Sequence, residues 1–228
     1  TEWISNSFTR RMSVKYMMSL FLLIGMLWLV EQNESFAMSR KVPTTPIEVK
    51  PTPIPEKPVE KLALSWEKNH PERKEWSAFV SELLSAELFE AFDLAKDATR
   101  ICPKYETLAR DQRIAVWSEL ISATAYYESG WSPVSRMTET TMGTDPVTKK
   151  QVVSEGLLQL SYQDVPNYGA VLKYPLCRIE WQKDKGLEVT SSKKTILDPL
   201  INLECGMRIL ANQIKKKGNV ILASGVYW

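Results

Sequence analysis

Glu128 has the position along the chain that most favours acid–base chemistry. The pattern predicts a helix over residues 111–130, with Asp111 as its N-cap and Gly130 as its stop. At about 100° per residue, one face of this helix is apolar and carries Ile114, Trp117, Ile121 and Ala125. Glu128 falls on the same face and Trp131 follows closely, so we expect apolar surroundings to raise the pKa of Glu128. A carboxylic acid that keeps its proton near neutral pH is suited to general acid catalysis.

A carboxylate near a helix end also has a simpler interpretation. Glu128 could reach past the end of the helix into solvent, or it could pair with a cation such as Arg136. Glu128 alone therefore does not establish an enzyme.

Composition excludes several other catalytic classes. The chain has a single histidine, His70, so it cannot build a Ser-His-Asp triad, a Cys-His pair or a zinc site of several histidines. The 29 Lys and Arg against 27 Asp and Glu give a net charge of +2, which is no argument for nucleic acid. With 228 residues, 44% of them hydrophobic, we expect one domain with flanking segments. Carboxylates, hydroxyls and amides are left for catalysis, and we expect no metal and no cofactor.

The chain after residue 64 has a mostly helical pattern. Residues 75–95 place Trp76, Phe79, Val80, Leu83 and Leu84 at helical spacing. Residues 138–153 differ, because Thr-Asp-Pro-Val-Thr is a turn signal and Gln-Val-Val favours a strand. We expect a mostly α fold with a small hairpin or irregular insertion there.

Three short motifs follow one another in the second half of the chain. They are residues 127–133 (YESGWSP), 155–161 (EGLLQLS) and 199–210 (PLINLECGMRIL). In order and in comparable spacing they resemble the motifs of soluble lytic transglycosylases and goose-type lysozymes, and the resemblance covers about residues 108–228. It implies a lysozyme-like domain that acts on bacterial peptidoglycan.

The resemblance implies roles for six residues of the first two motifs. Glu128 would be the catalytic acid and then the base, and Ser129 would support the site. The substrate groove would be lined by Gln159 and by the backbone of Gly156, Leu157 and Leu158. A glycine permits close approach of the backbone, two leucines can anchor the turn, and an amide can bind sugar hydroxyl or N-acetyl groups.

The third motif predicts a helix that is chiefly core. Asp198 can cap it, and Pro199 can occupy its first turn. Its apolar stripe consists of Leu200, Leu203, Met207, Leu210 and Ile214. Asn202 and Gly206 face elsewhere, so we assign them packing and hydrogen-bonding roles near the groove.

The sequence departs from the family pattern in two places. The segment between Glu128 and Gly156 is longer than in compact transglycosylases, and Glu139, Asp145 and Glu155 are candidates there for a second carboxylate that holds a water. For any one of these three, a solvated loop charge is the simpler alternative. The family's Tyr-Asn pair corresponds to Tyr227–Trp228, where the sequence stops, so we expect a truncated domain in which Tyr227 contributes to substrate binding.

The N-terminal region predicts export. Arg10, Arg11 and Lys15 precede an apolar run over residues 17–30, and a small-residue site ends at Ala37, which is the order of a secretory signal peptide. We therefore predict a signal peptide over residues 1–37, of which 1–11 could be upstream sequence, a Pro-rich linker over 38–65 and a catalytic domain over 66–228. An uncleaved membrane anchor is the alternative, but the run is shorter than a bilayer span.

Export to the periplasm or outside the cell permits disulfides. Cys102, Cys177 and Cys205 allow one bridge, for which we favour Cys177–Cys205 because both lie in the second half of the domain. Three small buried thiols are the alternative.

The predicted activity is cleavage of the β-1,4 linkage between N-acetylmuramic acid and N-acetylglucosamine in peptidoglycan strands, by a monomer without stable membrane insertion. The N-acetyl carbonyl would assist, and the product would be either anhydro-ended or hydrolysed. A non-catalytic peptidoglycan-binding module of the same fold is the alternative. An enzyme for chitin-like or modified glycans is a weaker one.

Overall fold

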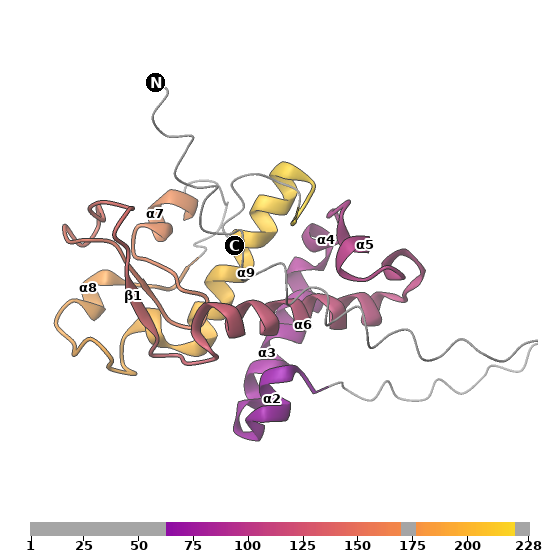
Figure 1. The fold of residues 1–228 in the computed structure, drawn as a ribbon, viewed down its shortest axis with the longest axis horizontal. Coiled ribbons are helices and arrows are strands. Elements are labelled where there is room, and N and C mark those ends of the chain that lie inside the picture. Colours follow the sequence, from indigo (N-terminus) through magenta and orange to yellow (C-terminus); the bar gives the residue numbers. More distant parts are fainter. Residues whose placement is uncertain (1–62, 170–176, 222–228) are drawn as a thin grey trace, which may run out of the picture. The chain divides into compact units, whose positions relative to one another are not determined.

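Helices make up most of the computed structural model, which describes residues 63–169 and 177–221 (Figure 1). The two described strands form one small antiparallel hairpin. In chain order the elements are α2 (Ser65–Asn69), η1 (Pro71–Arg73), α3 (Lys74–Leu83), η2 (Leu84–Leu88), α4 (Phe89–Phe92), α5 (Ala98–Ile101), η3 (Tyr105–Thr107), α6 (Arg110–Ser129), β1 (Arg136–Thr138), β2 (Val153–Glu155), α7 (Asp164–Gly169), α8 (Trp181–Asp184), η4 (Thr195–Leu197) and α9 (Pro199–Lys217).

Helix α6 is the long central element, and it packs against α2, α3 and η2. Its predicted apolar face is confirmed, because Ile114, Trp117, Ile121 and Ala125 are all buried. The predicted cap is wrong: the residue before the helix is Ala109, whose backbone N–H donates to the Gln112 side chain at 3.0 Å. Asp111 lies instead in the first turn, where its charge complements the positive end of the helix.

The predicted helix over residues 75–95 is present with an interruption. A single π turn, η2, separates α3 from α4, and the axis of each part continues against α9. A π turn inserts one residue into the helical repeat, which periodicity in the sequence does not reveal. Val80, Leu83, Leu84, Leu88, Phe89 and Phe92 are buried along this run.

The hairpin pairs Arg136 with Glu155, Met137 with Ser154 and Thr138 with Val153. The hairpin was expected within residues 138–153, but its strands lie at and just beyond the two ends of that range. The residues between them form a loop that is closed by Asp145, whose carboxylate accepts the backbone N–H groups of Val147 and Thr148 at 2.7 and 3.2 Å. In Figure 1 the hairpin and α8 lie at the C-terminal end of α6, and α4 and α5 lie toward its other end.

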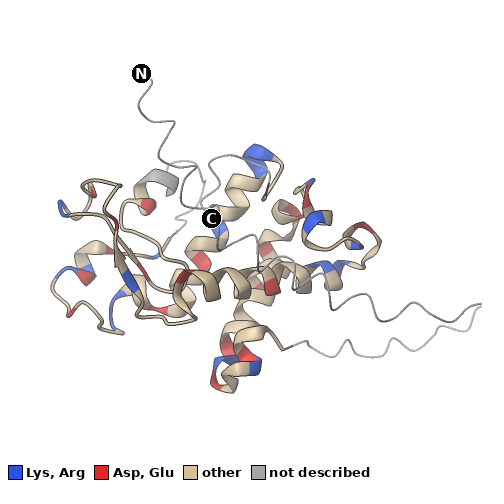
Figure 2. Cartoon of the chain, in the orientation of Figure 1, with Lys and Arg blue, Asp and Glu red and all other residues tan. Residues whose placement is uncertain are grey.

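Helix α9 begins as predicted, with Pro199 in its first turn and the Asp198 carboxylate accepting the N–H groups of Leu200 and Ile201 at 2.9 Å each. Three charged residues, Lys215–Lys217, end it and complement the helix dipole (Figure 2). Most of the predicted stripe is buried, namely Leu203, Met207, Leu210 and Ile214, whereas Leu200 is half-buried. Asn202 and Gly206 are buried as well, so this helix is covered on several sides.

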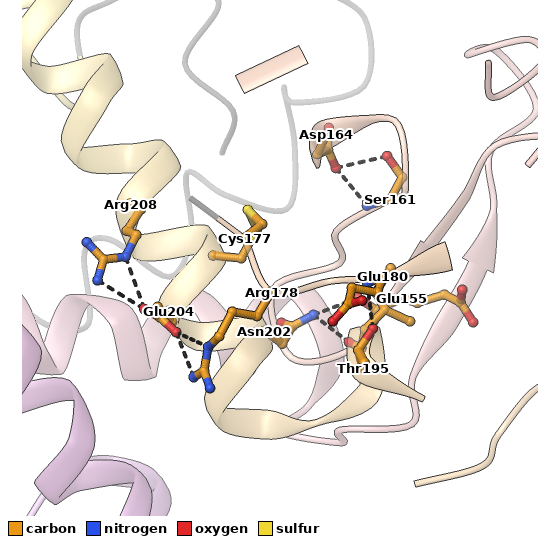
Figure 3. The surroundings of a disulfide bond; sticks show 12 residues. Glu155, Ser161, Asp164, Cys177, Arg178, Glu180, Thr195, Asn202, Glu204 and Arg208 are labelled. Atoms are coloured by element: carbon orange, nitrogen blue, oxygen red, sulfur yellow. Dashed lines mark hydrogen bonds and ion pairs between the residues drawn. A yellow bond between two sulfur atoms is a disulfide. The ribbon is translucent and has the colours of Figure 1, made fainter. Parts of the chain in front are cut away.

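A disulfide joins Cys177 to Cys205, as favoured from the sequence, and Cys102 is free. Next to it, the Glu204 carboxylate accepts from Arg178 at 2.7 Å and from Arg208 at 3.0 Å (Figure 3). The covalent bond and the ion pairs therefore attach the segment that begins at Cys177 to the middle of α9.

Several predictions fall on residues that the structure does not describe. The signal peptide, nearly all of the linker and Tyr227 lie outside the described residues. In the part of the chain that is described, no helix combines the length and the apolar character that crossing a membrane requires.

Replacing Cys177 and Cys205 together by serine should lower the free energy of unfolding by about 3 kcal/mol, because the bond closes a loop of 28 residues in the unfolded chain. Urea unfolding of the variant and of the wild type, each with and without reductant, would measure this. Reductant should destabilise the wild type and leave the variant unchanged, and an equal response of both would contradict the prediction.

Candidate active site

Glu128 lies in the last turn of α6, where the chain leaves the helix. Burial raises the pKa of Glu128 above its ordinary value, and the nearby charge of Glu139 raises it further. Ser129 does not contact Glu128 through its hydroxyl, which donates instead to the carbonyl of Ala125 at 2.8 Å. The inward-facing acid expected from the helical pattern is therefore present, and a second carboxylate lies within electrostatic reach of it.

The turn after α6 uses two residues with positive φ, Gly130 at 59° and Trp131 at 61°. This conformation is unfavourable for a bulky residue such as Trp131 and turns the chain sharply back. The Trp131 ring packs on Tyr126 at 4.8 Å, and its indole N–H donates to the carbonyl of Ser122 at 2.8 Å. Tyr126 precedes Glu128 by two residues, which is roughly 160° around a helix. The contacts that fix the Trp131 ring are therefore made with Tyr126 and Ser122.

Arg136 pairs with Glu155 at 3.4 Å, so the alternative in which it neutralises Glu128 does not hold. Glu155 is buried and also accepts from the buried Lys194 at 2.6 Å. Glu155 was a candidate for the second carboxylate, and the structure gives it two cationic partners instead. It holds the end of the hairpin to the segment before α9.

The three candidate second carboxylates occupy different environments. Asp145 is buried, and beyond closing its own loop it accepts the N–H of Gln163 at 3.1 Å. Asp145 and Glu155 thus have structural partners. Glu139 is half-buried, and its carboxylate accepts the hydroxyl of Ser154 at 2.6 Å. Of the three, Glu139 is the one whose charge acts on Glu128.

The turn over residues 156–159 approaches other backbone closely. Gly156 has φ 82°, and a Cβ there would lie 2.8 Å from the Ile196 carbonyl oxygen and would overlap the Asn202 side chain. Leu157 and Leu158 are fully buried, which confirms that they anchor the turn. Because their side chains are enclosed, only the backbone of these two residues remains for the predicted contacts with a saccharide.

Asn202 joins this turn to α9 and η4. Its side-chain oxygen accepts the N–H of Leu158 at 2.8 Å, and its amide group donates to the carbonyls of Glu155 and Ile196 at 3.2 and 2.9 Å. The hydrogen-bonding role predicted for Asn202 is therefore present. It acts beneath the turn, in the core.

Gln159 also has positive φ, at 49°, and is buried. Its amide nitrogen donates to the carbonyl of Gly156 at 2.9 Å and to that of Ser135 at 3.4 Å. The side chain that was expected to reach toward a sugar therefore bridges the turn to the segment after α6. A ligand would have to compete with these two carbonyls for the amide group of Gln159.

Sequence reasoning missed Ser154 and Lys194. Ser154 contacts Glu139, and Lys194 neutralises Glu155, across 15 and 39 residues of chain. A serine in a short β-prone segment and a lysine in a charged loop carry no local signal of such partners. Alternation along the strand could have placed Ser154 and Glu155 on opposite faces of the hairpin.

Two cavities lie away from Glu128. One, of about 160 Å³, is lined by residues that include Arg136, Glu155, Tyr162, Trp181 and Lys194, behind the hairpin. The other, of about 180 Å³, lies near Asp93, Tyr105 and Arg113. Within residues 63–169 and 177–221, no three His, Cys, Asp or Glu side chains gather closely enough to hold a metal ion.

No protein-family model and no curated protein matches this chain. The chain is similar to the solved structure of Bd0314 DslA, wild-type form 2, with a TM-score of 0.55, 26% identity and coverage of 74% of this chain and 86% of that one. Two variants of DslA match at the same coverage, with TM-scores of 0.56 and 0.55 and identities of 25% and 26%. Each variant replaces one glutamate by glutamine, at positions 143 and 154 of DslA's own numbering.

Gly156→Ala should lower the free energy of unfolding by about 3 kcal/mol or more, because it adds both a strained φ and a collision with the Ile196 carbonyl. Gly143→Ala is a matched control, since Gly143 has φ 72° but open space around its Cβ position. It should cost only about 1 kcal/mol. Chemical unfolding of both variants would test this, and equal losses would contradict the close approach.

Glu128→Gln should raise the stability of the protein at pH 7 by up to about 1 kcal/mol. The folded-state pKa of Glu128 lies above its ordinary value of 4.5, so its stabilising effect is complete below that value and is lost as the pH rises through the folded pKa. Glutamine removes the penalty of a desolvated charge beside Glu139. The gain should vanish near pH 4, whereas the exposed control Glu106→Gln should show no such pH dependence. Urea unfolding at both pH values would reveal the opposite trend if Glu128 were stabilising when ionised.

Proposed function

We propose that this protein is a lysozyme-like glycosidase that cleaves the β-1,4 linkages of peptidoglycan. The observation that carries the proposal is the half-buried Glu128 with its raised pKa, facing the charge of Glu139. A carboxyl group with a raised pKa beside a second carboxylate is the arrangement that glycoside hydrolysis requires. The order of the three sequence motifs directs the proposal to peptidoglycan.

The similarity to DslA gives independent support to the pair. The two glutamates that were replaced in DslA are 11 positions apart. Glu128 and Glu139 are also 11 positions apart, and among the glutamates of the described residues they are the one pair with that spacing. We infer that the two pairs correspond, so that the residues singled out in DslA are those that the electrostatics single out in this chain.

The proposed reaction begins with proton transfer from Glu128 to the glycosidic oxygen. The bond between the anomeric carbon and that oxygen then breaks, and positive charge develops at the anomeric carbon. Glu139, which accepts a hydrogen bond from Ser154, stabilises this charge and accepts a proton from a water that attacks the carbon. Glu139 then returns its proton to solvent and Glu128 regains one. With a base present for water, this scheme favours a hydrolysed product over an anhydro end.

The disulfide supports an exported location, as predicted from the N-terminal sequence. Disulfides persist in oxidising compartments such as the periplasm or the exterior of the cell. Peptidoglycan lies in the same compartments, so the bond between Cys177 and Cys205 is consistent with the proposed substrate.

Digestion of purified peptidoglycan by the full chain tests the proposal. The wild type should release muropeptides with ordinary reducing ends, and Glu128→Gln should lower the rate by at least about 100-fold, because it removes the general acid. Glu106→Gln, an exposed carboxylate on another part of the surface, is the control and should retain full activity. Mass spectrometry separates the two chemistries, since an anhydro product is lighter by one water. Full lysis by Glu128→Gln would refute the assignment of the acid, and anhydro products would refute the role of Glu139 as the base.

A further inference from the structure

Ser154 occupies the middle of β2 and lies opposite Met137. Its side chain is almost fully buried, at 6% exposure, although serine is ordinarily a surface residue. The hydroxyl donates to Oε1 of Glu139 at 2.6 Å, which is short for such a bond and typical of a donor to an ionised carboxylate.

The backbone of Glu139 is fixed by two further bonds. Its N–H donates to the carbonyl of Val152 at 2.9 Å, and its carbonyl accepts the amide group of Gln151 at 2.5 Å. The loop between these residues is in turn closed by Asp145. With the backbone held, the remaining freedom of Glu139 lies in its side-chain torsions, and the Ser154 hydroxyl restricts those.

Alternation along β2 separates two functions of the strand. Val153 and Glu155 line the cavity behind the hairpin, where Glu155 meets Arg136 and Lys194. Ser154, between them, points to the other face and to Glu139. The same three residues therefore anchor the hairpin on one side and present a hydrogen-bond donor on the other.

We infer that Ser154 is a positioning residue, which orients the carboxylate of Glu139 toward Glu128. A serine hydroxyl has one proton to donate, and an ionised carboxylate can only accept, so the bond is strongest when Glu139 carries its charge. The charge of Glu139 in turn adds to the effect of burial in raising the pKa of Glu128. This inference rests on the proposed function and adds a residue that acts through Glu139 and belongs to none of the three motifs.

A double-mutant cycle tests the inference. On purified peptidoglycan, Ser154→Ala should lower kcat about tenfold with little change in KM, because a charge-assisted hydrogen bond to the base is lost. In the Glu139→Gln background, the same substitution should change kcat by less than about twofold.

Two variants separate positioning from a loss of stability. Ser161→Ala removes another buried hydroxyl-to-carboxylate bond, from Ser161 to Asp164 at 2.8 Å, and should leave kcat unchanged (Figure 3). Ser154→Thr keeps the hydroxyl and should restore most of the activity. Equal losses from Ser154→Ala in both backgrounds, or no recovery in Ser154→Thr, would overturn the inference while the wild type still lyses peptidoglycan. A wild type without lytic activity would overturn the proposed function, and this inference with it.

Discussion

The geometry of the candidate active site depends on the side-chain amide of Asn202. This one group, enclosed in the core, bonds to the turn over residues 156–159, to the end of β2 and to η4. An amide buried with its partners satisfied is stable, and its loss would remove one hydrogen-bond partner from each of three backbone groups in a low dielectric. The turn then fixes the segment after α6, because the N–H of Gly156 donates to the carbonyl of Ser135 at 2.9 Å. The hairpin and the end of α6 are therefore held in one frame.

Glu155, which is buried, and Glu128, which is half-buried, lie in opposite electrostatic environments. Glu155 has Lys194 and Arg136 as partners, and its charge is compensated where it is buried. Glu128 is desolvated, and the charge that acts on it is a second carboxylate. The first arrangement stabilises the fold, and the second stores an unfavourable interaction at one end of α6. Such local destabilisation is typical of functional sites, where the surrounding structure supplies the compensating stability.

The sequence predicted those features that depend on local periodicity and capping. The apolar face of α6, the stop at Gly130, the Asp198 cap and the hairpin all follow from patterns within a few residues. The π turn η2 and the start of α6 after Ala109 were not predicted, because neither has a distinctive local pattern in the sequence. Glu128 was found for the same local reason, since helical spacing placed it on the buried face.

The partners of each side chain were harder to predict than its location. Glu139, Asp145 and Glu155 were equivalent as loop charges, and they became distinct only when the fold brought Ser154, Gln163 and Lys194 to them. The orientation of Gln159 was also beyond sequence reasoning, because its positive φ turns the amide back to the chain. Contacts between residues far apart in sequence decide these assignments, and a single sequence contains no record of them.

The position of Glu128 in the last turn of α6 adds a contribution that belongs to the backbone itself. The aligned peptide dipoles of a 20-residue helix leave a partial negative charge at its C-terminal end, close to where Glu128 projects. This field disfavours a carboxylate and favours a carboxylic acid, whichever ligand is bound and whichever residues surround the site. The length and direction of the helix thus contribute to the proton affinity of the acid, and no substitution of a neighbouring side chain would remove that contribution.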